Sequence, residues 1–180
     1  FLGICIALQI LFASTEEGGW HQCLDIIAGL VRKLPPKLKI PHMGWNQVKQ
    51  KISHPIFNGI PDEANFYFAH SYYVEPKDSL LTAGETEYGI SICSVLTRGN
   101  MVATQFHPEK SGRAGLQILK NFIEVGAKKT KPVGMLRPTR LAKRIIACLD
   151  VRSNDRGDLV VTKGDQYDVR ENGVVRNLGK

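Results

Sequence analysis

The sequence predicts an α/β protein made of one larger domain and the beginning of a second. Three observations predict this class. Residues 1–9 combine an apolar run and Cys5 with a helix-forming segment, the pattern of a strand that turns sharply into a helix. Residues 88–106 and 112–125 are typical of a strand pair followed by an amphipathic helix. Residues 144–151 form an apolar strand with an acid near its C-terminal end, which is typical of parallel α/β barrels.

The first turn has the features of a nucleophile elbow. A tight turn requires small residues on both sides of the nucleophile, which here are Gly3 and Ala7, the latter a weaker substitute for glycine. We expect a helix over residues 5–13 whose N-terminus favours a Cys5 thiolate and a developing oxyanion. A cysteine in an apolar run is more often a buried core residue, so both roles stay open at this point.

The next segment is expected to contain a helix and a loop. Residues 20–34 carry an irregular apolar pattern that we assign to a helix ended by Pro35 and Pro36. Residues 38–50 are expected to form a loop with Trp45 as an aromatic anchor. Trp45 either fills a gap in the core or meets a partner surface.

From Asn65 the sequence turns towards strands. Residues 65–74 are rich in aromatics, and strands at 88–97 and 101–106 are joined by the hairpin turn Arg98–Asn100. Residues 112–125 follow as an amphipathic helix. Its apolar face is expected to consist of Leu116, Leu119, Phe122 and Ile123.

The net charge of +7 has one local source, because residues 128–144 hold seven basic side chains and no acid. A basic cluster can bind nucleic acid, but this one lacks interleaved aromatics and contains prolines, so we predict a solvated linker over residues 127–140. Beyond it, the apolar strand 144–151 and a second strand at 159–164 are separated by a polar turn. This pattern predicts the first strand and hairpin of a barrel.

The remaining composition limits the class of protein. Four widely spaced cysteines are typical of reduced thiols in a cytoplasmic protein, with a plastid as the alternative compartment in a plant or an alga. We expect no membrane span, no signal peptide and no cofactor or metal site. A parallel strand needs neighbours on both sides, so we also expect the chain to be a fragment that hydrolyses glutamine slowly or not at all.

A second group of chemically active residues follows the 101–106 strand. His107 and Glu109 are two apart on a segment that we expect to be extended, so their side chains lean to the same side. A carboxylate beside an imidazole fixes its tautomer and supports the charge that it gains as a general base. With Cys5 as nucleophile, the three residues make a Cys-His-Glu set.

These motifs together resemble the class I glutamine amidotransferases, and specifically the glutaminase part of imidazole glycerol phosphate synthases. The motifs that carry this resemblance are Pro41–Asn46, His70–Tyr73 and His107–Ser111. Leu141–Val151 and Val161–Arg170 resemble the start of the cyclase barrel in the fused forms. The resemblance implies a partial, flavodoxin-like, mostly parallel amidotransferase domain at residues 1–126 that lacks its N-terminal strands. Residues 141–180 would be the N-terminal fragment of a (β/α)8 barrel.

The resemblance also implies roles for single residues. The catalytic set would be Cys5, His107 and Glu109, and the substrate would be held by Gln9, Glu17, Ser71 and Tyr72. The cyclase interface and ammonia path would include Trp45, Asn46, Lys110 and Arg144, and the cyclase site would include Asp150 and Lys163. The implied partners are glutamine and a cyclase barrel, with no nucleic acid and no membrane.

Two departures from the family pattern matter. Ala7 replaces an elbow glycine, and the oxyanion-loop residues that precede the nucleophile in the family do not occur before Cys5. Residues 18–39 also match the family weakly. Three alternatives remain: a glutaminase serving another synthase, a catalytically silent interaction fragment, and a basic nucleic-acid binder.

Overall fold

A computed structural model describes most of the chain. The described residues are 1–128, 151–153, 159–161, 170–171 and 174–175, with side chains described for residues 1–124. The chain divides into two compact units, Phe1–Ile146 and Ala147–Lys180. In the described part of the chain, no helix is both long enough and apolar enough to cross a bilayer.

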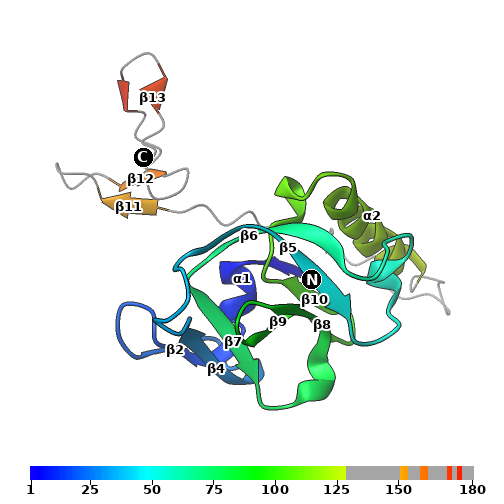
Figure 1. The fold of residues 1–180 in the computed structure, drawn as a ribbon, viewed down its shortest axis with the longest axis horizontal. Coiled ribbons are helices and arrows are strands. Elements are labelled where there is room, and N and C mark those ends of the chain that lie inside the picture. Colours follow the sequence, from blue (N-terminus) through cyan, green and yellow to red (C-terminus); the bar gives the residue numbers. More distant parts are fainter. Residues whose placement is uncertain (129–150, 154–158, 162–169, 172–173, 176–180) are drawn as a thin grey trace, which may run out of the picture. The chain divides into compact units, whose positions relative to one another are not determined.

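The larger unit contains two β-sheets (Figure 1). The six-stranded sheet consists, in spatial order, of β1 (Leu2–Ile4), β10 (Met101–Thr104), β9 (Ser91–Arg98), β8 (Thr82–Glu87), β5 (His42–Gln50) and β6 (Ala64–His70). The four-stranded sheet consists of β3 (His21–Gln22), β2 (Phe12–Thr15), β4 (Ile27–Lys33) and β7 (Tyr72–Pro76). The helical elements are α1 (Ile6–Gln9), α2 (Gly112–Lys128) and the 3₁₀ turns η1 (Pro55–Phe57), η2 (Ser79–Leu81) and η3 (Pro108–Lys110).

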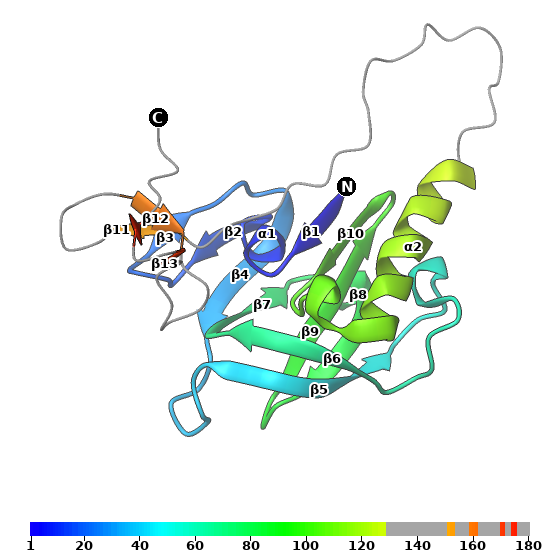
Figure 2. The same ribbon diagram turned by 90° about the horizontal axis from the view of Figure 1, so that it is seen from above.

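Apolar side chains cover both faces of the six-stranded sheet. Neighbouring strand residues point to opposite faces, so Val102 packs with Ile118 of α2, whereas Ala103 packs with Leu8 of α1 and Phe12 of β2. Figure 2 shows α2 along one side of this sheet, with α1, β2 and β4 on the other. The sheet is therefore the central layer of an α/β unit.

The expected mostly parallel sheet is a correction. Among the described strands, only the β1–β10 and β2–β4 pairs are parallel, and all other pairs are antiparallel. Short connections explain this difference, because antiparallel neighbours can be joined by a tight turn whereas parallel neighbours need a crossover. The α/β class itself is correct, with a mixed sheet in place of a parallel one.

Two predicted helices are wrong in extent or type. The helix expected over residues 5–13 ends at Gln9, and β2 begins at Phe12 with alternating burial. Residues 20–34, predicted as a helix, form β3 and β4 instead. In β4 a side chain at Gly29 would place its Cβ 2.2 Å from the Glu75 carbonyl of β7. The sheet interior, and not local propensity, decides the structure here.

The loop expected over residues 38–50 is also wrong, because residues 42–50 form β5. Its exposed and inward-facing positions alternate, with His42 and Val48 buried while Met43 and Trp45 are exposed. A buried histidine takes the place of an apolar residue in this alternation, which is why the strand pattern is weak in the sequence.

The later elements agree better with the sequence. The strands expected at 88–97 and 101–106 are β9 and β10, an antiparallel hairpin with Gly99 at φ 61°. Residues 65–74 divide into β6 and β7, which belong to different sheets. The helix expected at 112–125 is α2, but Leu116 and Ile123 are exposed, and the packing face consists of Ala114, Ile118, Leu119 and Phe122.

The smaller unit contains two antiparallel pairs among its described residues. β11 (Val151–Ser153) pairs with β12 (Leu159–Val161), and β13 (Arg170–Glu171) pairs with β14 (Val174–Val175). The hairpin agrees with expectation. The strand predicted at 144–151 lies outside the described residues except for Val151. Since α2 continues to Lys128, the first two residues of the predicted linker 127–140 are helical and the others lie outside the described residues. The barrel start stays a prediction.

Candidate active site

Cys5 occupies a strained turn between β1 and α1. Its backbone has φ 51° and ψ −107°, a conformation that residues other than glycine rarely adopt. The Cys5 N–H donates to the Thr104 carbonyl at 2.7 Å, and the Cys5 carbonyl accepts from the Leu8 N–H at 2.9 Å. These bonds hold the turn, which confirms the strand-elbow-helix prediction.

Gly3 is required by close packing at this turn. A Cβ on Gly3 would lie 3.0 Å from the Phe1 ring, 3.1 Å from the Ala7 carbonyl and 3.2 Å from the Ala103 side chain. Ala7 is itself buried. The small residues expected on both sides of Cys5 therefore lie where β1, α1 and β10 approach one another.

Parallel pairing of β1 with β10 brings the two predicted motifs to one end of the sheet. Ile4 lies opposite Thr104, so Cys5 and the segment 105–107 leave neighbouring strands at the same edge. Gln105 Nε2 donates to Cys5 Sγ at 3.7 Å. Residues far apart in the sequence thus become neighbours through strand register.

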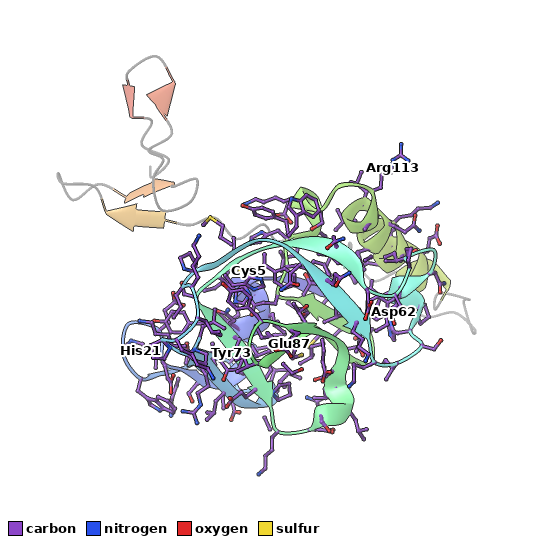
Figure 3. All side chains as sticks on the ribbon, viewed as in Figure 1. Cys5, His21, Asp62, Tyr73, Glu87 and Arg113 are labelled. Atoms are coloured by element: carbon purple, nitrogen blue, oxygen red, sulfur yellow. The ribbon has the colours of Figure 1, made fainter. Side chains whose placement is uncertain are left out.

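Strand β6 passes over this edge of the sheet. Cys5 Sγ lies 3.9 Å from the Ala69 carbonyl, and the His107 N–H donates to the Tyr67 carbonyl at 2.9 Å. Positions two apart in a strand are separated by about 7 Å, so Cys5 and His107 adjoin the same short stretch of β6. Figure 3 shows Cys5 near the middle of the larger unit, away from Arg113 and Asp62.

His107 and Glu109 form a direct pair. His107 Nδ1 lies 2.7 Å from Glu109 Oε1, and the His107 ring is 19% exposed. The segment is not extended throughout, as expected, because His107 caps the 3₁₀ turn η3 that contains Glu109. The Ser111 hydroxyl donates to the His107 carbonyl at 2.6 Å and holds the turn.

The pair has the electrostatics of a base and its orienting acid. Burial raises the pKa of Glu109, but the hydrogen bond from His107, a backbone N–H and nearby Lys110 outweigh burial, so the pKa lies below its usual value. A carboxylate that accepts from Nδ1 leaves Nε2 as the proton-accepting nitrogen of a neutral imidazole. The geometry can therefore orient His107 for proton transfer.

The residues expected to hold substrate fall into two places. Gln9 is buried, and its Nε2 donates to the Tyr72 carbonyl at 2.9 Å, close to the site. Ser71 precedes Tyr72, and its carbonyl accepts from the Leu34 N–H. Glu17 lies in the exposed turn between β2 and β3, where its N–H donates to Thr15 Oγ1.

The residues expected to face a partner also differ in setting. Trp45 is 57% exposed and makes an edge contact with the Tyr67 ring, and Lys110 is exposed in η3. Asn46 lies on the opposite face of β5, where its Nδ2 donates to the Glu87 carbonyl at 3.1 Å. Arg144, Asp150 and Lys163 lie outside the described residues.

Sequence reasoning missed three side chains near the site: Gln105, His42 and His70. His42 Nδ1 lies 3.0 Å from His70 Nε2, and both rings are buried. Burial lowers the pKa of each histidine to about 4. The two histidines lie in motifs that carried the family resemblance, but their pairing depends on the β5–β6 register, which the sequence does not reveal.

Comparison with known proteins identifies relatives of the chain. Residues 1–125 match the family described as Glutamine amidotransferase class-I. Imidazole glycerol phosphate synthase subunit HisH from Dehalococcoides mccartyi (strain CBDB1) is 53% identical over 124 residues, which cover 69% of this chain and 60% of that relative. Imidazole glycerol phosphate synthase hisHF, chloroplastic, from Arabidopsis thaliana is 46% identical over 187 residues, which cover 100% of this chain and 31% of that relative.

A solved structure has a similar fold. The crystal structure of a putative GMP synthase protein from Thermoplasma acidophilum is similar at a TM-score of 0.52 and 26% identity, covering 71% of this chain and 57% of that one. Among the sequence relatives, this chain spans about 60% of the length of HisH proteins such as that of Dehalococcoides mccartyi.

The buried histidine pair predicts an acid-sensitive fold. Unfolded histidines take up protons below pH 6.5, whereas the folded rings stay neutral down to about pH 4, so the free energy of unfolding should decrease as pH falls through this window. Urea unfolding at several pH values measures the slope. His42→Phe should give a shallower slope, and His21→Gln, which changes an exposed histidine, should keep it. An unchanged slope in His42→Phe would contradict the assignment.

Proposed function

Because this chain belongs to the class-I glutamine amidotransferase family, we propose that it hydrolyses the side-chain amide of glutamine and supplies ammonia for imidazole glycerol phosphate synthesis in histidine biosynthesis. The observation that carries the proposal is the strained Cys5 turn at the same sheet edge as the His107–Glu109 pair. Identity of 53% to a relative named imidazole glycerol phosphate synthase subunit HisH supports the choice of pathway.

The proposed reaction has two halves. Cys5 transfers its thiol proton to His107 Nε2, and Sγ attacks the amide carbon of glutamine. The tetrahedral intermediate collapses when His107 returns the proton to the departing nitrogen, which releases ammonia and leaves a γ-glutamyl thioester on Cys5. Water then gives a proton to His107 and attacks the thioester, and glutamate leaves as the sulfur is reprotonated.

The surrounding residues have supporting roles in this proposal. Glu109 keeps His107 in the required tautomer and stabilises the imidazolium. The backbone N–H of Ile6, the first residue of α1, is the candidate donor to the oxyanion. Gln9 and the Ser71–Tyr72 backbone lie beside the site and are the candidate substrate contacts, whereas Glu17 reaches substrate only if its turn approaches the site.

Ammonia release from glutamine tests this function. Cys5→Ala should abolish release, and His107→Asn should reduce it by about 10²–10⁴-fold because the general base is lost. Glu109→Gln should have a smaller effect of about tenfold or more, because the imidazole remains. Cys23→Ala is the matched control, since Cys23 is a free thiol in the unit and should leave the rate unchanged.

The same assay separates the rival functions. Release that persists in Cys5→Ala would contradict the proposed nucleophile. Complete inactivity of the wild-type chain, both alone and with a cyclase barrel, would favour a silent interaction fragment.

We further infer that the outer surface of β5 docks to a cyclase barrel. Met43 and Trp45 are exposed neighbours on the same face of this strand, and Trp45 contacts Tyr67 of β6. Exposed aromatic side chains of this kind are frequent anchors in interfaces. Residues 141–180 are proposed as the start of such a barrel, since the Arabidopsis relative matches the whole chain; Arg144, Asp150 and Lys163 belong to this part of the proposal.

Two tryptophans of similar exposure give a test of this docking surface. Trp45 is 57% exposed and Trp20 is 61% exposed. Trp45→Ala should weaken binding of a separately purified imidazole glycerol phosphate synthase cyclase barrel by about thirtyfold, because a buried aromatic anchor is lost. Trp20→Ala should change the dissociation constant by less than about twofold. The reverse order in a calorimetric titration would refute the assignment.

A further inference from the structure

A line of hydrogen bonds runs through the interior from β5 and β8 towards the site. Asn46 Nδ2 donates to the Glu87 carbonyl at 3.1 Å and lies 3.3 Å from His42 Nε2. His42 Nδ1 lies 3.0 Å from His70 Nε2, and His70 Nδ1 lies 2.8 Å from the Tyr72 carbonyl. The two histidines occupy directly opposite positions in the β5–β6 ladder.

The line continues from the Tyr72 carbonyl to the sulfur of Cys5. Gln9 Nε2 donates to this carbonyl at 2.9 Å and to Gln105 Oε1 at 3.2 Å. Gln105 Nε2 then donates to Cys5 Sγ at 3.7 Å. One carbonyl is therefore shared by the histidine pair on one side and the two glutamine amides on the other.

Hydrogen-bond chemistry gives the line a single direction. A carbonyl only accepts, so His70 donates from Nδ1, and its Nε2 in a neutral ring must accept from His42 Nδ1. His42 Nε2 is then an acceptor for the Asn46 amide. Both protons of the Gln9 amide are likewise assigned, to the Tyr72 carbonyl and to Gln105 Oε1. This fixes the Gln105 amide with its nitrogen towards Cys5.

The surroundings hold both rings in place. His42 is stacked between the Phe68 ring at 4.7 Å and the Tyr88 ring at 3.8 Å. His70 is 6% exposed and is held on both nitrogens. Burial keeps the pKa of both rings near 4, so each carries one proton at neutral pH and the direction of the line is maintained.

We propose that His42 and His70 are positioning residues that fix the Tyr72 carbonyl, and through it the amides of Gln9 and Gln105, against Cys5. This inference rests on the proposed function of Cys5 as the nucleophile. The histidines touch neither Cys5 nor substrate, and they act through the carbonyl that Gln9 shares. Their loss should therefore weaken the recognition of glutamine more than the chemical step.

Two substitutions at His42 separate the hydrogen bond from the packing. His42→Phe keeps a ring between Phe68 and Tyr88 but cannot donate, whereas His42→Asn keeps an N–H donor near the Nδ1 position and loses the stacking. The probe is a diazoketone analogue of glutamine, which alkylates the nucleophile once and thus reports binding and reaction even in a slow enzyme. Saturation kinetics give a half-saturating concentration and a maximal rate, and peptide mapping identifies the labelled cysteine.

The expected result is a split between binding and chemistry. His42→Phe should raise the half-saturating concentration about tenfold, the typical effect of one lost buried hydrogen bond, with the maximal rate within about threefold. His42→Asn should recover most of the loss. Equal labelling of wild type and His42→Phe, or loss in both variants that follows their urea midpoints, would overturn the positioning role.

A second measurement keeps the inference independent of these variants. Nitrogen-15 spectra of the histidine-labelled wild-type chain should give the Nδ1–H tautomer for both His42 and His70, and an Nε2–H tautomer at either residue would overturn the proposal. Failure of the proposed function is distinguished because the wild type itself would then not be labelled at Cys5, and the positioning role would fall with it.

Discussion

Parallel pairing between β1 and β10 is the constraint on which the site depends. These two short strands are separated in sequence by most of the larger unit, yet Ile4 lies opposite Thr104 and the Cys5 N–H reaches the Thr104 carbonyl. The pairing requires close approach, which Gly3 permits because any larger side chain would meet Ala103. The same register delivers His107 to the edge at which Cys5 emerges. A shift of register would separate nucleophile from base without altering either motif.

Strand β6 gives this edge its polar roof. Its carbonyls at Tyr67 and Ala69 contact the two catalytic candidates, and its last residue, His70, carries the hydrogen bonds inward from β5. Among the described residues, no buried side-chain nitrogen or oxygen lacks a hydrogen-bond partner. Because an unpaired polar group in the interior is costly, a complete set of partners makes the arrangement around Cys5 stiff as well as specific. Rigid support of this kind is what a nucleophile in a strained turn requires.

The sequence predicts the parts of this arrangement that are local. Gly3 and Cys5 reveal the elbow, Gly99 marks the β9–β10 hairpin, and the pair His107–Glu109 is correct although its segment is a 3₁₀ turn. It fails where the environment decides. Residues 20–34 are strands because β4 lies between β2 and β7, with Gly29 against a backbone carbonyl, a contact that no local pattern encodes. The family resemblance supplied roles, but the histidine pair needs the register of β5 against β6, which only the fold provides.

Detection of a covalent intermediate decides whether Cys5 is the nucleophile. The chain is mixed with glutamine, quenched in acid within the first turnover and digested for mass spectrometry. We expect a mass increase of one γ-glutamyl group on the peptide that contains Cys5, because a thioester must form before water can release glutamate. Ammonia release without any adduct on Cys5, or with the adduct on Cys23 or Cys93, would contradict this role of Cys5.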